Sequence, residues 1–233
     1  MPRRDARLVK LNAGAPEWGS VEHLETIPFG SKLCVERFHF KNGMELLACE
    51  DHAAPVVAYH TFYKVGSRHE REGKTGLAHL FEHLMFNEVE GRAPGEFDRK
   101  LEEAGAESNA STWLDWTHYN IAVPKDRLGL VIGLEAERMS RLVLRDPQVT
   151  SEKEVVANER RYRVDDDVEG SVSELLWATA FTRHAFEHGA HDLIEHVTFD
   201  IRRHQRARRE CPHPARIGAA IVVKNALVIL SRG

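Results

Sequence analysis

Apolar residues recur at helical spacing between Thr75 and Phe86. Leu77, Phe81 and Leu84 follow one another at steps of four and three residues, so they would share one face of an α-helix. Thr75 is expected to cap the start of this helix, because its hydroxyl can accept a hydrogen bond from a free backbone N–H. The pattern therefore predicts an amphipathic helix with one buried face.

Alternating and β-branched apolar positions predict strands on both sides of this helix. Asn42-Gly43 supplies the positive φ angles of a tight turn, so the stretches that flank it are expected to form a β-hairpin. The expected strands are Val35–Phe40, Met44–Cys49, Val56–Val65 and Thr117–Val123, and Glu107–Trp113 is expected to be extended.

Further helices are predicted at Pro94–Ala104, Pro124–Leu144, Ser151–Val164 and Ser171–Phe181. Ser151 and Glu154 have the spacing of a capping box, which sets the expected start of one of them. Strands, a hairpin and helices are intermixed along the chain. This order indicates an α+β fold, a two-layer sandwich of a mostly antiparallel sheet packed with helices, rather than a doubly wound parallel sheet.

The two ends of the chain differ in character from the middle. Residues 1–30 show no clear apolar period and contain several glycines and prolines, so they are expected to form an irregular N-terminal arm. Residues 31–181 form the predicted main domain. Residues 182–233 are basic and rich in histidine, and only Ile217–Leu230 is expected to be ordered, as a strand or as a hairpin around Lys224-Asn225.

Composition excludes several classes of protein. The formal net charge of −4 gives no global attraction to nucleic acid or to a membrane, and no apolar run is long enough to span a bilayer. A group of arginines between residues 202 and 216 lacks the interleaved aromatic residues of a nucleic-acid-binding module.

The basic N-terminus lacks the apolar core of a signal peptide, so a cytoplasmic location is expected. Cys34, Cys49 and Cys211 are too few and too scattered for a disulfide framework.

The predicted helix at residues 75–86 carries a candidate zinc site. His79, Glu82 and His83 stand at positions i, i+3 and i+4, so they project from one side of the helix. Two imidazoles one turn apart can bind a single Zn²⁺, and the glutamate between them can reach a water on the metal.

This H-x-x-E-H spacing alone is a weak signal in a chain with 14 histidines, and it occurs a second time at His184–His188. Gly189 directly follows the second match and few acidic residues come after it, so the second match is predicted to be part of a solvated tail that could bind metal adventitiously.

A catalytic zinc usually needs a third protein ligand, and Glu159 is the candidate. Glu159 falls on one helical stripe with Glu152, Val155 and Val156, so its carboxylate is expected to point inward with the valines. A buried carboxylate is costly unless a charge or a donor meets it, and either a metal ion or an arginine would do so.

Four motifs in order resemble the pitrilysin family of zinc endopeptidases, which includes insulinase and the mitochondrial processing peptidases. They are His79-x-x-Glu82-His83, Asn109-Ala110-Ser111-Thr112, Glu135-Ala136-Glu137-Arg138-Met139 and the stretch from Glu152 through Asn158-Glu159-Arg160-Arg161. The resemblance covers about Val35 to Phe181 and implies one Zn²⁺ per chain.

By this resemblance each candidate residue receives a role. His79, His83 and Glu159 would be the metal ligands and Glu82 the general base. Glu152 would be an accessory glutamate of the catalytic site. Asn109 and Ala110 would lie on an edge strand that aligns the backbone of the substrate.

The resemblance also implies an architecture and a function. The family's α+β sandwich is normally one repeat of several that close as a clamshell, so this chain would be an N-terminal catalytic domain. The expected activity is hydrolysis of peptides or unfolded proteins, with help from a partner subunit, a second domain or a second copy. After Phe181 the resemblance stops, and a truncated, diverged or frame-disrupted tail are all open. The alternative is a subunit that binds zinc and peptide without cutting, or a truncated inactive homologue.

Overall fold

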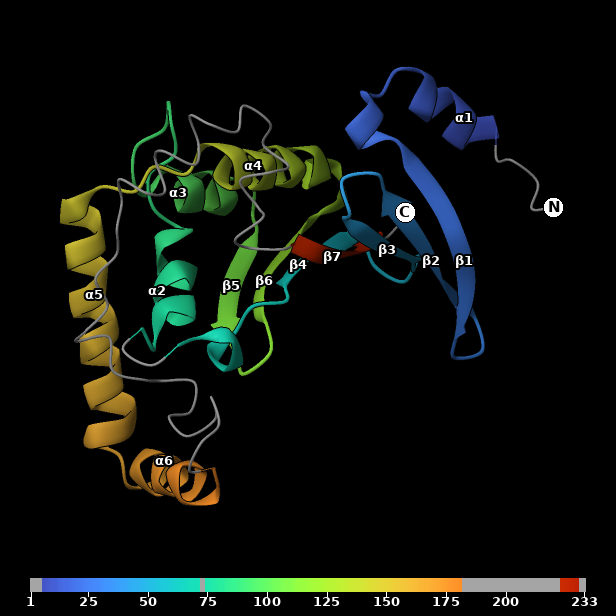
Figure 1. Cartoon of the computed structure of the whole chain (residues 1–233). Coiled ribbons are helices and arrows are strands. Elements are labelled where there is room, and N and C mark those ends of the chain that lie inside the picture. Colours follow the sequence, from blue (N-terminus) through green and yellow to red (C-terminus); the bar gives the residue numbers. More distant parts are fainter. Residues whose placement is uncertain (1–5, 72–73, 182–222, 231–233) are drawn as a thin grey trace.

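The protein is described by a computed structural model that covers residues 6–71, 74–181 and 223–230. Its centre is one seven-stranded sheet with the strand order β1-β2-β3-β7-β4-β6-β5 (Figure 1). The strands are β1 (Val21–Phe29), β2 (Leu33–Phe40), β3 (Glu45–Glu50), β4 (Val56–Tyr63), β5 (Glu107–Thr112), β6 (Thr117–Pro124) and β7 (Val223–Leu230).

The sheet is antiparallel at every pairing except that of β3 with β7. The expected hairpin is confirmed, because β2 and β3 pair antiparallel and Gly43 in the turn has a φ of +89°. The expected α+β class with a mostly antiparallel sheet is confirmed as well. Strand β7 lies between β3 and β4, although it comes last in the chain. Lys224-Asn225 lies inside this strand, so the alternative of a hairpin around that pair is wrong.

The expectation of an irregular arm over residues 1–30 is wrong for most of that segment. Ala6–Ala13 forms helix α1, Glu17–Gly19 forms a short 3-10 helix, and Val21–Phe29 forms the edge strand β1. Only Val21 of this strand is buried. The strand forms because the backbone of β2 offers it a complete antiparallel partner, and a strand exposed on both faces leaves no apolar alternation to read in the sequence. The division of the chain at residues 31 and 181 stays a prediction.

Helices α2 (Leu77–Leu84), α3 (Glu96–Glu103) and α4 (Leu128–Arg141) cover the half of the sheet formed by β4, β6 and β5 (Figure 1). Helix α5 (Asp146–Arg160) packs against α2, and α6 (Val168–Ala180) follows α5 away from the sheet. Two buried clusters join helices α2 to α5 to the strands: one centres on Leu80, Leu84, Tyr119 and Val156, the other on Val57, Phe97, Leu101, Val123 and Val131. The packed core therefore lies under α2, α3 and α4.

Two predicted helix starts are wrong. Helix α2 begins after Gly76, whose φ of +78° suits glycine, so Thr75 is not its N-cap. Helix α5 begins at Asp146 with proline in its first turn, so Ser151 and Glu154 lie inside the helix instead of capping it. Val156 of this helix is buried as expected, whereas Val155 is 46% exposed.

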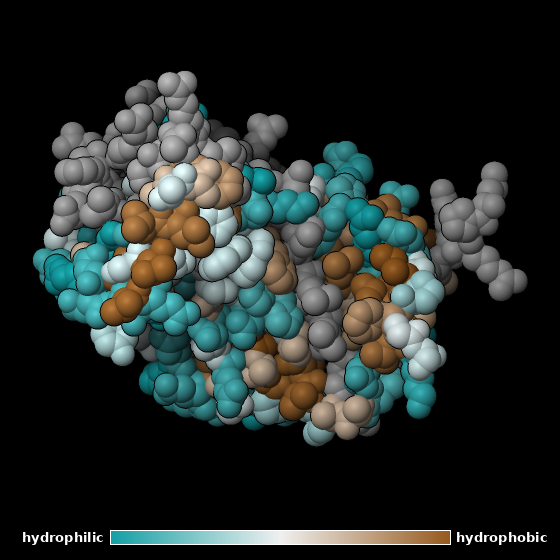
Figure 2. All heavy atoms as spheres, turned by 90° about the horizontal axis from the view of Figure 1, so that it is seen from below, coloured by the Kyte–Doolittle hydropathy of each residue, from teal (hydrophilic) through white to brown (hydrophobic). Residues whose placement is uncertain are grey.

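Helix α6 presents an unusually apolar surface to solvent. It buries none of its residues, and its exposed apolar side chains include Val168, Val172, Leu175 and Leu176. Figure 2 views the molecule from below, the side on which α6 lies in Figure 1, and apolar side chains gather there. Exposed apolar patches of this kind mark surfaces that other protein segments cover. Among the described residues, no helix is both long and apolar enough to cross a membrane.

Candidate metal centre and active site

Helix α2 brings the two predicted histidine ligands together. His79 and His83 are one turn apart, and their Nε2 atoms are 3.3 Å from each other. His79 is buried and His83 is half-buried, so both imidazoles are partly withdrawn from water. The Nε2 atoms of the two rings therefore face a common point.

Helix α5 packs against α2 and adds the predicted third ligand. The Oε2 atom of Glu159 lies 3.5 Å from Nε2 of His79 and 3.4 Å from Nε2 of His83. Its other oxygen, Oε1, is 3.0 Å from Nη2 of Arg163. Of the two partners that the sequence left open, an arginine is present at one oxygen of Glu159, and the other oxygen faces the two predicted histidine ligands of a metal ion.

The three atoms have the spacing of a metal site. Two ligands bound to a tetrahedral Zn²⁺ at its usual bond lengths of about 2.0–2.1 Å lie roughly 3.3 Å apart. The three separations between Nε2 of His79, Nε2 of His83 and Oε2 of Glu159 are 3.3, 3.4 and 3.5 Å. In the described part of the chain, these three residues are also the only group of histidine, cysteine and acidic side chains with metal-binding geometry. The donor set of two imidazoles and a carboxylate fits zinc.

Electrostatics favours a cation at this point. Hydrogen bonds from His79 and His83, and then the charge of Arg163, hold the pKa of Glu159 well below its ordinary value, so its carboxylate is ionised. Burial lowers the pKa of His83, but the hydrogen bond and charge of Glu159, with the charges of Glu82 and Glu152, outweigh burial and raise it. The surrounding carboxylates thus stabilise positive charge between the two rings.

The predicted base, Glu82, lies beside these three residues without belonging to the ligand group. Its Oε2 atom accepts a 2.5 Å hydrogen bond from the hydroxyl of Thr112, which comes from strand β5. Thr112 is held in turn by Thr117, whose hydroxyl lies 3.3 Å away and donates to the carbonyl of Val65. The carboxylate of Glu82 is therefore fixed from the strand side through Oε2, and no described residue forms a hydrogen bond with Oε1.

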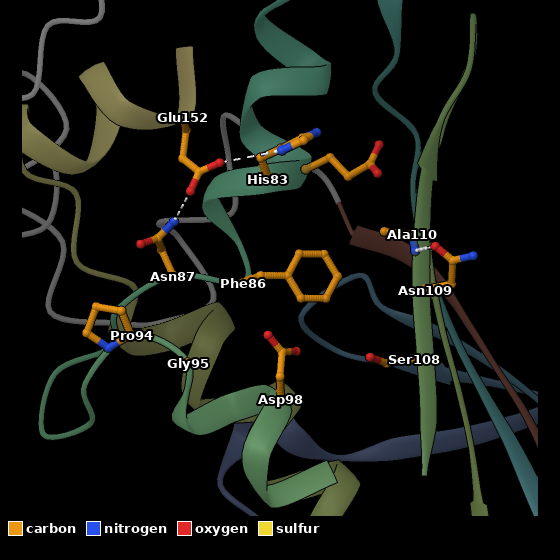
Figure 3. A pocket seen from close by; sticks show the side chains of 11 residues that line it. His83, Phe86, Asn87, Pro94, Gly95, Asp98, Ser108, Asn109, Ala110 and Glu152 are labelled. Carbon is orange, nitrogen blue, oxygen red and sulfur yellow. Dashed lines mark hydrogen bonds and ion pairs between the residues drawn. The ribbon is translucent and has the colours of Figure 1, made fainter. Parts of the chain in front are cut away.

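Glu152 faces the Nδ1 side of the His83 ring, whereas Glu159 faces its Nε2 side. Its Oε2 atom is 3.5 Å from Nδ1 of His83, and its Oε1 atom accepts a 2.8 Å hydrogen bond from the side-chain amide of Asn87 (Figure 3). A carboxylate on the far nitrogen of a metal-binding histidine orients the ring and raises its basicity. This position suits a supporting role better than direct contact with substrate.

Asn109 and Ala110 lie on β5, which is the last strand of the sheet order and therefore an edge. The side-chain oxygen of Asn109 accepts a 2.8 Å hydrogen bond from the backbone N–H of Ala110 (Figure 3). An incoming peptide strand that used this N–H would have to displace Asn109. The structure thus places both residues at an edge next to the candidate metal site formed by His79, His83 and Glu159.

A cavity of about 510 Å³ opens beside the candidate metal site, between α2, α3 and β5 (Figure 3). Its lining residues are Glu82, His83, Phe86, Asn87, Pro94, Gly95, Asp98, Ser108, Asn109, Ala110 and Glu152. It therefore connects the predicted base, one histidine and the edge strand in a single space.

Three residues around the site were missed by sequence reasoning. The carboxylate of Glu70 accepts hydrogen bonds from the backbone N–H groups of Gly76 and Ala78, at 2.8 and 2.6 Å, and so caps helix α2. Thr112 stood inside a family motif but had no assigned role. Asn87 carries no local signal, because its partner Glu152 is 65 positions away in the sequence. Glu70 could have been found as an acidic residue shortly before a helix start.

Comparison with known proteins decides the family. A sequence model of the insulinase family, Peptidase family M16, matches residues 46–191. The chain belongs to the insulinase family. The resemblance of its four motifs is thereby confirmed, and membership supports a peptidase function in general terms.

Named relatives within the insulinase family are zinc proteases and complex subunits. The zinc protease PqqE of Helicobacter pylori is 36% identical over 152 residues, which is 65% of this chain and 34% of that protein. Subunit 1 of the mitochondrial cytochrome b-c1 complex of Rattus norvegicus is 30% identical over 140 residues, 60% of this chain and 29% of that protein. The chain thus spans about a third of the length of these relatives.

Solved structures show the same architecture. The crystal structure of a protease from Helicobacter pylori superimposes with a TM-score of 0.73 at 28% identity, over 91% of this chain and 47% of that one. Insulinase-family relatives named as zinc proteases make Zn²⁺ the metal that matches the histidine and glutamate group. The second H-x-x-E-H match at His184–His188 lies outside the described residues. The cytoplasmic location expected from the sequence stays a prediction.

Proposed function

We propose that this chain is the zinc-binding part of a metalloendopeptidase that hydrolyses peptides or unfolded proteins. The observation that carries the proposal is the ligand geometry: His79, His83 and Glu159 present three atoms at zinc spacing. Glu82 stands next to them, fixed by Thr112 and with one carboxylate oxygen open. A metal site with a carboxylate base beside it is the arrangement that zinc-dependent peptide hydrolysis uses.

His79, His83 and Glu159 would hold one Zn²⁺. Bound zinc would supply a water with its pKa lowered to about 7 and a charge for the developing oxyanion. Glu82 would take the proton of the attacking water at Oε1, since Thr112 occupies Oε2, and would pass it to the leaving amine. Glu82 is thus the proposed general base and acid.

Glu152 would support the reaction through His83. Its carboxylate faces Nδ1 of that ring and is itself fixed by Asn87, so it keeps the metal-binding nitrogen aimed at the candidate metal site. The substrate backbone would lie along the edge of β5 at Asn109 and Ala110, as an added strand. Backbone pairing of this kind gives affinity with little dependence on side chains.

A partner half is part of the proposal. The protease structure from Helicobacter pylori is matched over less than half of its length, and the relatives over about a third. The exposed apolar side chains of α6 provide a surface that a second domain or subunit, or a second copy of the chain, could cover. We therefore expect the chain alone to hold substrate poorly, because alignment and oxyanion donors come partly from the facing half.

The alternative is a subunit that binds zinc and peptide without cutting. It is favoured by one specific observation, the 30% identity to a subunit of the cytochrome b-c1 complex, whose name states no peptidase activity. Metal content does not separate the two functions, since both bind zinc.

The test is cleavage of an unstructured fluorogenic peptide by the zinc-loaded chain, alone and with a candidate partner half. We expect slow hydrolysis by the chain alone, faster hydrolysis with the partner, loss with a chelator and recovery with zinc. Zinc at one per chain with no turnover under either condition would favour the non-catalytic subunit. Turnover by the monomer alone at the median enzyme rate of about 10 s⁻¹ would contradict the need for a partner.

A further inference from the structure

The cavity beside the candidate metal site has the size of a binding pocket for one large side chain and the backbone next to it. Its volume is about 510 Å³, within the usual range for ligand sites of roughly 300–1,000 Å³. His83 lies at one end, and Ser108 to Ala110 of the edge strand form one wall (Figure 3). Glu82 also lines the cavity. A peptide laid along β5 would therefore place a side chain in this cavity close to the bond that is cut.

The cavity combines an apolar wall with negative charge. Phe86 and Pro94 contribute apolar surface, and Glu82, Asp98 and Glu152 are its charged residues. Among the described residues that line it, none is a lysine or an arginine. Glu82 and Glu152 already accept hydrogen bonds from Thr112 and Asn87, respectively.

Asp98 differs from the other two carboxylates. It projects from α3 toward Phe86 and the interior of the cavity (Figure 3). In the described part of the chain, its carboxylate has no hydrogen bond and no ion pair, although it is half-buried. Two arginines close to it in the sequence or by their charge already have carboxylate partners, because Arg99 pairs with Glu103 at 2.5 Å and Arg138 pairs with Glu135 at 2.6 Å.

On balance, the surroundings of Asp98 disfavour its charged form. Burial raises the pKa of this carboxyl, the charge of Glu102 raises it further, and only Arg138 opposes the two. Arg138 is itself buried against the rings of Phe86, Phe97 and Tyr119, so it does not line the cavity. A positive group that entered from outside would gain an unpaired carboxylate as its partner.

We propose that this cavity selects a substrate side chain with a positive charge, arginine or lysine, and that Asp98 is the residue that determines this preference. The carboxylate of Asp98 would pair with the charged end, and Phe86 would contact the aliphatic stem. Arginine would be the better ligand, because its planar guanidinium can bond a carboxylate through two N–H groups. The inference rests on the proposed function, since it places a peptide along β5.

The experiment measures binding separately from cleavage. Two fluorescent peptides with the same sequence carry either arginine or citrulline, which has the same shape without the charge. Their dissociation constants for the zinc-loaded Glu82→Gln chain are measured by anisotropy. We expect the arginine peptide to bind about 10 to 100 times more tightly, the usual scale for a hydrogen bond to a charged group.

Two second substitutions in the same background locate the preference. Asp98→Asn keeps the shape of the side chain and removes its charge, so the preference for arginine should disappear. Glu102→Gln removes the same charge from an exposed position on the same helix, one turn away, and should leave the preference in place. Equal binding of the two peptides, or a preference that survives Asp98→Asn, would overturn the inference.

The failure of this inference and the failure of the proposed function are distinguishable. Cleavage sites in a mixed peptide library, identified by mass spectrometry with the unsubstituted chain and the partner half present, report on hydrolysis. A clear preference for arginine in binding without any cleavage would count against the endopeptidase and leave the pocket assignment supported. Cleavage that does not depend on the charge of the substrate side chain, together with equal binding of the two peptides, would support the endopeptidase and count against the pocket assignment.

Discussion

Two pairs of histidines in this chain have opposite surroundings. His79 and His83 on α2 face Oε2 of Glu159 at 3.5 and 3.4 Å, and Glu152 stands behind His83. His60 and His118, on β4 and β6, are stacked with their Nδ1 and Nε2 atoms 2.8 Å apart. At that separation one ring nitrogen donates to the other, so the nitrogens that face each other are already used.

The neighbours of the strand pair are aromatic. Phe62 stacks on His118 with 4.2 Å between ring centroids, and Trp116 meets the same ring edge-on. Burial lowers the pKa of His60 and of His118, whereas carboxylates raise that of His83. Identical side chains thus become a candidate metal site or a neutral packed pair according to the carboxylates within reach.

The largest effect is expected at Glu82. Glu82→Gln keeps the size of the side chain and its bond from Thr112 but removes the base, so hydrolysis should fall by at least about 10²-fold while zinc stays bound. Peptide cleavage and zinc content are measured together, with the partner half present. His60→Gln is the matched control and should change neither quantity. Loss of zinc from Glu82→Gln would show that Glu82 is a ligand or a structural residue.

A smaller effect is expected at Glu152. Glu152→Gln removes the negative charge behind His83, so the affinity for zinc should fall about 10- to 100-fold, the usual scale for such a partner. Competition with a chromophoric chelator measures the dissociation constant. Glu154→Gln, an exposed change on the same helix, should leave affinity as it is. Equal zinc affinities for the two variants would show that Glu152 does not contribute to zinc binding.

Thr112 is expected to act on rate rather than on binding. Thr112→Val keeps the shape but removes the hydroxyl that fixes Glu82, and kcat should fall by roughly tenfold, the order of one charged hydrogen bond, with KM unchanged. Thr112→Ser restores the hydroxyl and should recover most of the rate. A loss shared by both variants would indicate that packing on β5 matters instead.

The smallest expected effect is on the pH dependence of stability in the zinc-free chain. The raised pKa of His83 means that its protonation favours the folded state, a contribution present below the ordinary pKa of about 6.5 and lost as pH rises through the folded value. His118 has a lowered pKa, so its contribution is present above about pH 6.5 and lost as pH falls.

Urea unfolding between about pH 5.5 and 8, the range around the ordinary histidine pKa, measures both contributions. The free energy of unfolding of the unsubstituted chain minus that of His83→Gln should grow as pH falls. The same difference for His118→Gln should shrink. Parallel changes for the two variants would contradict the contrast between the pairs.

Much of the fold was predictable because each element carried a local signal. The hairpin at Asn42-Gly43 and the buried faces of α2 and α3 follow from turn chemistry and helical spacing. Strand β1 was missed, since an edge strand with one buried residue shows no alternation. The insertion of β7 between β3 and β4 is a long-range pairing that no local pattern encodes.

The candidate site likewise contains residues with a local sequence signal and contacts that no local signal predicts. His79, Glu82 and His83 share one helix, so their spacing alone predicts that they meet. Glu159 was found from a stripe on another helix together with the family motif, and the structure brings it to the histidines. The bonds of Thr112 to Glu82 and of Asn87 to Glu152 join positions 30 and 65 residues apart, so only the packing of α2 against β5 and α5 reveals them.

We infer that His79 and His83, the histidine pair with carboxylates within reach, hold the metal, and the zinc content of variants shows whether they do. Zinc-loaded protein is dialysed and analysed for metal as the unsubstituted chain and as four variants: His79→Ala, Glu159→Ala, the double change at His60 and His118, and the double change at His184 and His188. We expect about one zinc per chain, the stoichiometry of a three-ligand catalytic site, in the unsubstituted chain and both double variants. The two single variants should hold almost none. A full content of zinc in His79→Ala, with loss of zinc when His184 and His188 are changed, would show that the zinc is bound elsewhere than at His79, His83 and Glu159.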